Sequence, residues 1–262
     1  MAAPGARPVG ALDDASAARS VRQMFDSIAP RYDLLNHLLS ANVDRLWWRR
    51  TARCFQAVLA RPEAAILDVC CGTGDLTLAL LQLRPQAARP ILAVDFAHAM
   101  LCRGAQKFAG ISSDGVNGSE AENVAPRVIP LEADALQLPL RDTSIDLIVT
   151  SFGFRNLANY EAGLREFHRV LKPGGQLGIL EFGEPEGLIG AVYGIYFRRV
   201  LPAIGRMVCG KPGPYNYLPN SVGAFPRPAA LVAMMESCGY ADCKWQPFTF
   251  GIAGLYTALR PF

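Results

Sequence analysis

The fold is decided by residues 66–74, which read Ile66-Leu67-Asp68-Val69-Cys70-Cys71-Gly72-Thr73-Gly74. An apolar run of β-forming residues ends at Asp68, and the chain then turns through two glycines. A helical pattern follows, marked by Leu76, Leu80 and Leu81. This order of strand, glycine turn and helix lets a backbone approach a ligand closely at a helix N-terminus. The stretch therefore predicts an α/β fold with a ligand site at the turn.

A second acid stands at the end of the next apolar run. Residues Ile91 to Val94 are followed by Asp95, twenty-one residues after Gly74. An acid at that distance lies at the carboxyl end of the neighbouring strand, where it can accept hydrogen bonds from both hydroxyls of a ribose. The two motifs together predict a nucleoside-containing cofactor.

The glycine turn also indicates which nucleoside is bound. The dinucleotide fingerprint G-x-G-x-x-G needs a third glycine for helix–strand packing beside a pyrophosphate, and Thr77 stands in that place. Asp75 inside the turn would repel a pyrophosphate but suits a ligand that carries a sulfonium and an ammonium group. Asp68 adds a second carboxylate facing the same place. Both acids favour S-adenosylmethionine over NAD.

Composition limits the range of functions. With 262 residues and 51% hydrophobic content, the chain can form one α/β domain, or that domain with a small lid. A net charge of +3 argues against a general nucleic-acid binder. The seven cysteines form no C-x-x-C pair, which predicts reduced thiols in the cytoplasm. No histidines or cysteines stand at zinc-ligand spacing, so no metal is expected.

The basic residues are unevenly distributed. Residues 1–61 carry nine arginines against five aspartates, and residues 198–211 carry four basic groups and no acid. This pattern indicates either a solvated basic face or contact with an anionic membrane surface. The longest apolar stretch, Gly187 to Phe197, is too short to span a bilayer. We therefore expect a cytoplasmic protein, with peripheral contact at the inner face of the cell membrane if the second interpretation holds.

The chain reads as a single domain over 15–262 behind a disordered N-terminus at 1–14. Within the domain we expect an N-terminal helical lid at 15–61 and a polar surface insertion at 110–126. Hydrophobic spacing in the second lid helix predicts a buried stripe that consists of Val43, Leu46, Trp47, Cys54, Phe55, Val58 and Leu59. The core alternates between strands near 65–70, 90–95, 127–131, 145–150 and 176–182 and helices near 74–83, 97–108, 159–171 and 228–238.

Two β-rich runs close the chain. Tyr240 to Phe248 and Phe250 to Leu259 are separated by Thr249 alone, so they are predicted to pair as an antiparallel hairpin, since a parallel crossover needs a dozen or more residues. The predicted fold is a Rossmann-like class I methyltransferase fold. Its mostly parallel seven-stranded sheet ends in the hairpin and carries helices on both faces. The hairpin and Thr77 disfavour a NAD oxidoreductase.

Three further segments carry a resemblance to a family. They are Phe25-Asp26-x-Ile28-Ala29-x-x-Tyr32-Asp33-x-x-Asn36, Ser151-Phe152-Gly153-Phe154-Arg155-Asn156, and Arg169-Val170-Leu171-Lys172-Pro173-Gly174-Gly175 running to Glu181. With the motif from Asp68 to Asp75, they resemble the ubiquinone/menaquinone biosynthesis C-methyltransferases, of the demethylmenaquinone methyltransferase type. The resemblance runs from about residue 20 to the C-terminus. The chain departs from it at Asp44, Gly183 and Asn220, where many members carry histidine, serine and glutamate.

The resemblance implies a set of cofactor contacts. Thr73 would contact the cofactor in the glycine turn formed by Gly72 and Gly74, and Asp95 would hold the ribose. Asp134 with Ala135 would bind the adenine, and Ser151 would lie beside the methionine end. Other roles stay open at this point: Asp134 or Asp95 as a helix cap, and Thr73 as a turn residue that serves only its own backbone.

Methyl transfer to carbon needs an electron-rich ring, so the acceptor is expected to be a reduced quinol with an ionised hydroxyl. Positioning of donor and acceptor then supplies most of the catalysis. Arg155 is the candidate to stabilise the oxyanion, with Asn156 as a further donor. The alternative for Arg155 is a structural salt bridge within its own loop. Candidates for the proton acceptor are Asp33, Tyr32, Tyr215, Tyr217, His37 and a water near Asp33.

The expected reaction is S-adenosylmethionine-dependent C-methylation of a polyprenylated quinol, with demethylmenaquinol favoured. The alternatives are the ubiquinone-pathway 2-methoxy-6-polyprenyl-1,4-benzoquinol, another small phenolic or sterol acceptor, and a non-catalytic cofactor-binding subunit. A homodimer or a quinone-biosynthesis complex is a further expectation. Residues 187–209 are either ordinary core or an interfacial helix that admits the isoprenoid tail.

Overall fold

The computed structural model describes residues 10–29, 42–113, 127–185 and 213–262, together with the isolated positions 5, 6, 8, 40, 187, 190 and 194. The predicted lid residues Tyr32, Asp33 and His37 lie outside the described residues. So do most of the insertion at 110–126 and nearly all of the apolar segment at 187–209.

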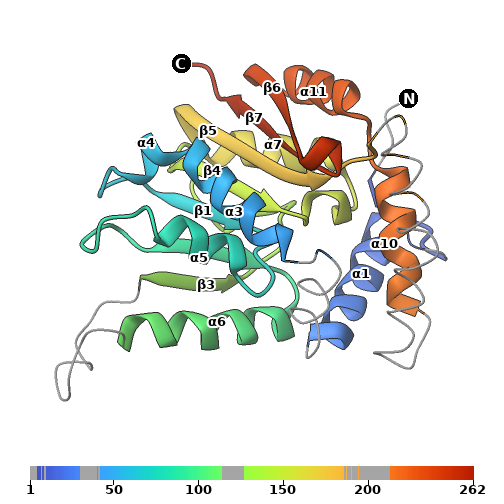
Figure 1. Ribbon diagram of the computed structural model, residues 1–262, viewed down its shortest axis with the longest axis horizontal. Coiled ribbons are helices and arrows are strands. Elements are labelled where there is room, and N and C mark those ends of the chain that lie inside the picture. Colours follow the sequence, from blue (N-terminus) through green and yellow to red (C-terminus); the bar gives the residue numbers. More distant parts are fainter. Residues whose placement is uncertain are drawn as a thin grey trace.

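A seven-stranded sheet forms the centre of the protein, with strand order β3-β2-β1-β4-β5-β7-β6 (Figure 1). Strands β1 to β5 run parallel to one another, and β7 is antiparallel to both β5 and β6. The strands are β1 (Ile66–Val69), β2 (Ile91–Asp95), β3 (Val128–Glu132), β4 (Ile145–Ser151), β5 (Leu171–Phe182), β6 (Ala241–Phe248) and β7 (Ala253–Leu259). The predicted fold class is confirmed.

Helices cover both faces of this sheet, because successive side chains of a strand point to opposite sides. On β4, Leu147 and Val149 pack with α3 (Val43–Cys54) and α5 (Asp75–Leu81), whereas Ile148 packs with α7 (Tyr160–Val170) and α11 (Pro228–Ser237). The remaining helical segments are α1 (Asp14–Ile28), α4 (Gln56–Leu59), α6 (His98–Ser113), α10 (Gly213–Ala224), η3 (Phe154–Asn156) and η5 (Thr249–Gly251). Helix α6 thus continues four residues into the expected insertion.

The N-terminal helix α1 begins with a capping box. The Asp13 side chain accepts a hydrogen bond from the Ser16 N–H at 2.7 Å, and the Ser16 side chain accepts in return from the Asp13 N–H. Ahead of this helix, Ala6 is buried and its N–H donates to the Leu157 carbonyl at 2.8 Å. Part of the segment expected to be disordered therefore contacts the domain.

Helix α3 presents a different face to the core from the one predicted. The buried face carries Trp47, Trp48, Thr51 and Ala52, while Leu46 is 60% exposed and Cys54 is exposed. Hydropathy alone favoured Leu46 over Thr51, whereas the helix turns its two tryptophans and the smaller residues toward the sheet. The placement of Leu46 and Cys54 in the buried stripe was wrong.

The closing hairpin is confirmed, but its connection is longer than predicted. Phe248 pairs with Ala253, so four residues (249–252) form the turn instead of Thr249 alone. Phe250 and Gly251 reverse the chain with φ of 58° and 89°. Thr249, with a φ of 45°, is left-handed as well. Three left-handed residues in a row cannot remain in a strand, and this explains why the β-rich character of Phe250 was misleading.

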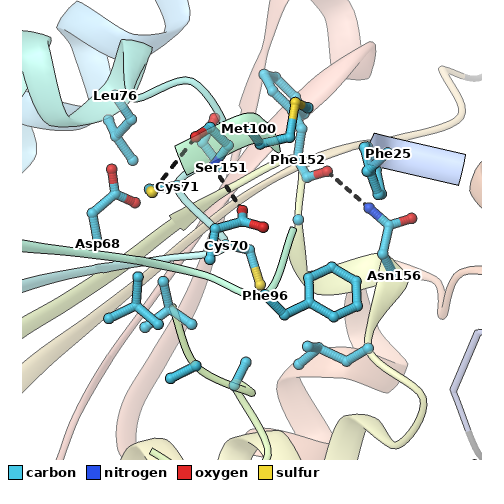
Figure 2. Close-up of a pocket in the computed structure, with 18 of the residues that line it drawn as sticks. Phe25, Asp68, Cys70, Cys71, Leu76, Phe96, Met100, Ser151, Phe152 and Asn156 are labelled. Carbon is cyan, nitrogen blue, oxygen red and sulfur yellow. Dashed lines mark hydrogen bonds between the residues drawn. The ribbon is translucent and has the colours of Figure 1, made fainter. Parts of the chain in front are cut away.

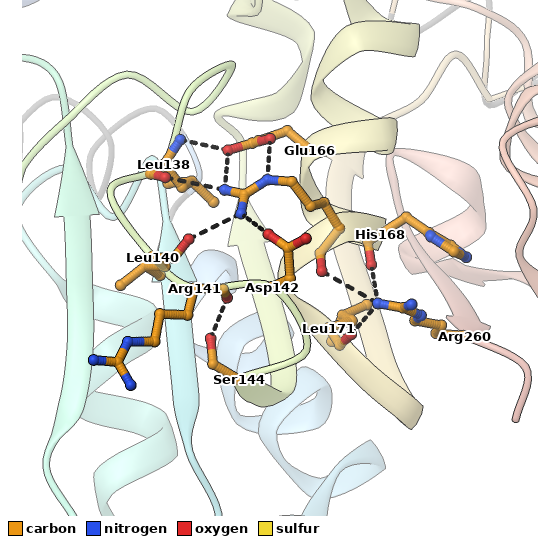
Figure 3. A network of polar contacts seen from close by, with 10 residues as sticks. Leu138, Leu140, Arg141, Asp142, Ser144, Glu166, His168, Leu171 and Arg260 are labelled. Atoms are coloured by element: carbon orange, nitrogen blue, oxygen red, sulfur yellow. Dashed lines mark hydrogen bonds and ion pairs between the residues drawn. The ribbon is translucent and has the colours of Figure 1, made fainter.

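An arginine network ties the far edge of the domain together (Figure 3). The Arg169 guanidinium pairs with Glu166 at 2.7 Å and donates to the carbonyls of Leu138 and Leu140. Arg260, just beyond β7, donates to the carbonyls of the α7–β5 junction, at 2.8 Å to His168. Because the carbonyls of the last helical turn lack intrahelical partners, Arg260 supplies the cap for α7.

Candidate active site

A cavity opens at the carboxyl ends of β1, β2 and β4 (Figure 2). Its empty volume, which includes open solvent at the mouth, is about 970 Å³. Of the predicted cofactor residues, all except Gly74 line it: Asp68, Gly72, Thr73, Asp95, Asp134, Ala135 and Ser151. Helix α1 contributes Ala18 and Phe25. The sequence motifs therefore meet around one space.

Glycine is required at position 74 for two reasons. Gly74 has a φ of 85° and begins α5, and a Cβ built there would lie 2.3 Å from the Phe108 ring. Gly72 also has a positive φ, and its N–H donates to the Asp95 carboxylate at 2.8 Å. The turn is thus held against the end of β2 while its backbone faces the cavity.

Asp95 acts both as a clamp and as a wall of the cavity. One carboxylate oxygen accepts from Gly72 N–H and the other from Ala97 N–H, each at 2.8 Å. Burial raises the pKa of Asp95 to about 6, against the opposing effect of these backbone donors. A carboxylate offers about four acceptor positions, more than these backbone donors occupy, so acceptor capacity remains for a ribose hydroxyl. The capping and ribose-binding interpretations are compatible.

Asp68 provides the test of whether a cationic cofactor fits. Its carboxylate is fully buried, and one oxygen accepts from the Thr77 hydroxyl at 2.6 Å. The other oxygen has no hydrogen-bond partner among the described residues. Burial, helped by the charges of Asp95 and Asp75 and opposed by the hydrogen bonds from Thr77, raises the pKa of Asp68 to about 7. An unpartnered carboxylate in an acidic cavity favours a positively charged ligand, so the site fits S-adenosylmethionine.

Thr73 and Asp75 share a cation that the sequence motifs do not reveal. The Lys107 ammonium on α6 donates to the Thr73 hydroxyl at 3.0 Å and pairs with the Asp75 carboxylate at 2.9 Å. The Asp75 charge is therefore partly compensated within the protein, which leaves Asp68 as the acid better placed to attract a cofactor cation.

The opposite end of the cavity is suited to a flat aromatic base. Asp134 lines it, and its side chain also accepts from the Leu136 N–H at 2.8 Å, so this acid caps its own turn as well. Apolar walls come from Phe96, Met100 and Leu136. Phe96 and Met100 follow β2 outside any motif, and sequence reasoning missed both.

Aromatic residues form the wall near Ser151. The Trp48 indole N–H donates to the Ser151 hydroxyl at 2.8 Å, and both residues line the cavity. Phe152 follows with a φ of 54° and stacks on Phe182 at 4.2 Å. Trp47 lies 5.8 Å from the Phe152 ring. A non-glycine residue at positive φ marks a position that the surrounding structure must hold in place.

Arg155 lies behind this wall and is absent from the described residues that line the cavity. Its guanidinium pairs with Glu181 on β5 at 3.0 Å, and its backbone N–H donates to the other Glu181 oxygen. Asn156 does line the cavity; it donates to the Phe152 carbonyl and accepts from the Tyr217 hydroxyl at 3.0 Å. The ion pair joins two strand ends instead of staying within one loop, and the catalytic role of Arg155 stays a prediction.

Two thiols face the same cavity. Cys70 and Cys71 both line it, and burial, followed by the charge of Asp95, raises their pKa well above the usual range. Both thiols are therefore held in the protonated form. Among the described residues, no cluster of histidines, cysteines and acids could hold a metal ion. No helix in the same ranges is long and apolar enough to cross a membrane.

Comparison with known proteins identifies the family. The ubiE/COQ5 methyltransferase family matches residues 13–260. The chain belongs to this family. The demethylmenaquinone methyltransferase of Deinococcus radiodurans is 44% identical over 98% of both chains. That of Thermus thermophilus is 45% identical over 91% of this chain and 100% of its own. The ubiquinone/menaquinone biosynthesis C-methyltransferase UbiE of Geobacter sulfurreducens is 40% identical over 90% and 87%.

Solved structures agree on the fold. An S-adenosylmethionine-dependent methyltransferase from Aquifex aeolicus matches with a TM-score of 0.55 at 16% identity, over 80% of this chain and 89% of that one. The [4+2]-cyclase SpnF matches with a TM-score of 0.64 at 15% identity, over 93% and 96%. The resemblance, the cofactor and the predicted class of reaction are confirmed: this ubiE/COQ5 family member is an S-adenosylmethionine-dependent C-methyltransferase.

Proposed function

We propose that this methyltransferase transfers a methyl group to a ring carbon of demethylmenaquinol, giving menaquinol. The observation that carries the proposal is the Asp68 oxygen, which has no partner in the described part of the chain and lies in a cavity whose other wall is aromatic. The acid suits a cationic methyl donor, and the aromatic side chains suit a flat apolar acceptor. The names of the relatives from Deinococcus radiodurans and Thermus thermophilus, at 44% and 45% identity, support this acceptor.

The cofactor would be held by the residues of the three strand ends. Asp95 would accept from the ribose hydroxyls, Asp134 and Ala135 would bind the adenine edge, and Asp68 would face the methionine ammonium. Thr73 and Ser151 complete the set, with the glycine turn supplying backbone donors. When bound, S-adenosylmethionine would supply a methyl group carried on a sulfonium, whose carbon an incoming nucleophile attacks in line with the bond to sulfur.

The acceptor ring would lie against Phe152 and Trp48, with Asn156 as the polar group of that wall. Because these side chains are packed and hydrogen bonded, they would orient the ring and exclude water from it. Arg155 would act from behind the wall, where its charge favours an ionised ring hydroxyl. The predicted catalytic partners Tyr32 and Asp33 belong to the segment outside the described residues and keep that role as part of the proposal.

Proton removal from the acceptor ring can also involve Tyr217 on α10. The Tyr217 hydroxyl donates to Asn156, and burial raises the pKa of Tyr217. A neutral tyrosine there can support Asn156 as a hydrogen-bond relay, but it is a poor base at neutral pH. Asp33, or a water held by it, is the better candidate for the base.

The proposed location is cytoplasmic, with peripheral contact at the inner face of the cell membrane where a polyprenylated quinol resides. The uneven basic charge of the sequence supports this contact. A homodimer or a quinone-biosynthesis complex is part of the same proposal. The segment first considered for membrane contact, around Arg198 and Arg199, lies outside the described residues.

The test is a methyl-transfer assay with S-adenosylmethionine labelled on its methyl group. Acceptors are demethylmenaquinone with and without a reductant, a 2-methoxy-6-polyprenyl-1,4-benzoquinol and a simple phenol. We expect label in menaquinone only with the reduced naphthoquinone. Transfer to the benzoquinol alone would replace the proposed acceptor, and transfer to the oxidised quinone would contradict the role of an ionised hydroxyl. In a strain lacking this protein, extracted quinones should accumulate in the demethyl form.

A further inference from the structure

The exposed face of helix α3 is strongly basic. Arg45, Arg49 and Arg53 recur every four residues and therefore share one side of the helix, with Arg50 beside them. All four are exposed, and Leu46 lies among them with 60% of its surface exposed. We call these five residues, together with Phe250, the basic face.

The charge of this face has no acidic partner within the described parts of the chain. Elsewhere in those ranges, Arg61, Arg165 and Arg169 each pair with a carboxylate at 3.1 Å or less. The α3 arginines have no such ion pair among the described residues. Arg50 instead makes a cation–π contact, with its guanidinium 4.3 Å from the centre of the Phe248 ring. Four cations without counter-charges within nine residues attract an anionic surface.

A large apolar side chain lies next to these arginines. Phe250, at the tip of the β6–β7 turn, is 77% exposed and has a φ of 58°. The turn lies against α3, because the Trp47 indole N–H donates to the Thr249 hydroxyl at 2.8 Å. The positive φ strains the backbone of a bulky residue, and exposure of its apolar ring to water is unfavourable for a protein alone in solution. Leu46 and Phe250 therefore provide apolar anchors beside a cluster of positive charge.

An aromatic row connects this surface with the cavity. Trp47, which holds the Phe250 turn, packs edge-on against Phe182 at 6.2 Å. Phe182 stacks on Phe152 at 4.2 Å, and Phe152 lines the cavity. Apolar side chains thus continue from the basic face to the wall beside Ser151.

We propose that the basic face docks on an anionic lipid bilayer, and that the aromatic row leads the isoprenoid tail of the acceptor into the cavity. Arginines beside exposed leucine and phenylalanine match the two layers of such a surface: phosphates outside, acyl chains beneath. A nucleic acid would complement the arginines but leave Leu46 and Phe250 in water. The docking step stands on the surface alone, whereas the tail path rests on the proposed function.

Docking is tested by sedimentation of the full-length protein with vesicles, in the absence of cofactor and acceptor. The unmodified protein should bind vesicles that contain phosphatidylglycerol and not vesicles of phosphatidylcholine alone, with binding weakened by salt. The variant Arg49→Glu/Arg53→Glu should bind at least about 25-fold more weakly, because each arginine near an anionic membrane contributes about fivefold. Leu46→Gln/Phe250→Ser should lose about tenfold or more through its apolar anchors.

The matched control is Arg89→Glu/Arg141→Glu, which changes the net charge equally but outside the basic face, in the segments that lead into β2 and β4. Both arginines are exposed, and Arg141 points away from the network in Figure 3. This variant should bind vesicles nearly as well as the unmodified protein. Equal weakening in both charge variants would overturn the proposal, and so would equal binding by all variants. A change in oligomeric mass in the α3 variant alone would assign the face to a protein interface and also overturn it.

A second readout separates the tail path from the proposed reaction. Arg49→Glu/Arg53→Glu should lower methylation of a long-chain acceptor embedded in anionic vesicles and leave methylation of a short-chain acceptor in detergent unchanged. Equal loss with both acceptors would contradict delivery from the membrane. If the unmodified protein methylates neither acceptor, the proposed function fails while the vesicle result still decides docking.

Discussion

Replacing Asp68 by asparagine should stabilise the cofactor-free protein and weaken cofactor binding. Asp68 is fully buried, one of its oxygens has no partner among the described residues, and burial raises its pKa from 3.8 to about 7. At about 1.4 kcal/mol per pKa unit, ionising this group within the fold costs about 4 kcal/mol relative to the unfolded chain. The substituted asparagine would avoid that penalty while its side-chain carbonyl still accepts from the Thr77 hydroxyl.

The sign of the pH dependence follows from the direction of the shift. The native state holds the Asp68 proton up to about pH 7, whereas the unfolded chain releases it near pH 4. Between these values the native state binds more protons, so Asp68 lowers stability as the pH rises. Asp68→Asn should therefore match the unmodified protein near pH 4 and exceed it by up to about 4 kcal/mol at pH 8.

The assay is urea unfolding of the cofactor-free proteins across this pH range, with Asp242→Asn as the control. Asp242 is exposed and has a φ of 52°, which asparagine tolerates, so the control should follow the unmodified protein. Calorimetry of cofactor binding is the second measurement. S-adenosylmethionine should bind Asp68→Asn more weakly and, at pH 6, release more protons from the unmodified protein than from the variant, in which Asp95 still has a raised pKa, of about 6. A variant that gains no stability at pH 8, or unmodified protein that releases no more protons than the variant, would refute the reasoning.

Three further substitutions probe the frame around the cavity. Glu181→Gln leaves the buried charge of Arg155 without its partner, and it should lower the free energy of unfolding by about 3–5 kcal/mol in urea titrations. Gly74→Ala forces a Cβ against Phe108 at a positive φ; it should destabilise the fold by about 1–3 kcal/mol and reduce the cofactor affinity measured by calorimetry. Trp48→Phe removes the indole N–H and replaces a buried bicyclic ring with a smaller aromatic ring. It should lose about 1 kcal/mol of stability from the hydrogen bond, with a further loss from packing, and raise KM for the acceptor more than it lowers kcat.

Local patterns predicted the parts of the site that local geometry determines. Asp68 lies one residue before the end of β1 and Asp95 ends β2. Because parallel strands place their carboxyl ends at one edge of the sheet, both acids could be assigned to one cavity from their positions alone. From the sequence, Thr77 served only as evidence against the dinucleotide-binding fingerprint, because it stands in place of the third glycine. Its hydroxyl in fact donates to Asp68, which lies nine residues earlier on the strand before the turn, a contact that the pattern did not weigh.

Contacts between distant segments were beyond such patterns. Lys107 reaches Thr73 from the middle of α6, and Trp48 reaches Ser151 from a helix 103 residues earlier. Neither belongs to a motif, and their positions depend on how two helices pack on the sheet. Arg155 illustrates the same limit: its partner Glu181 lies on the neighbouring strand, so the ion pair becomes visible only once β4 and β5 are side by side.

The buried acids also bear on side reactions of the methyl donor. A thiolate would compete with a ring carbon for the sulfonium, and Cys70 and Cys71 both face the cavity. Burial and the charge of Asp95 raise the pKa of these thiols, so they stay protonated and weakly nucleophilic. A positive residue in place of Asp95 could still fill the space, but it would repel the cofactor and favour the thiolates. Acids at the strand ends therefore serve two needs at once: they attract the cation, and they keep the nearest sulfur atoms from attacking it.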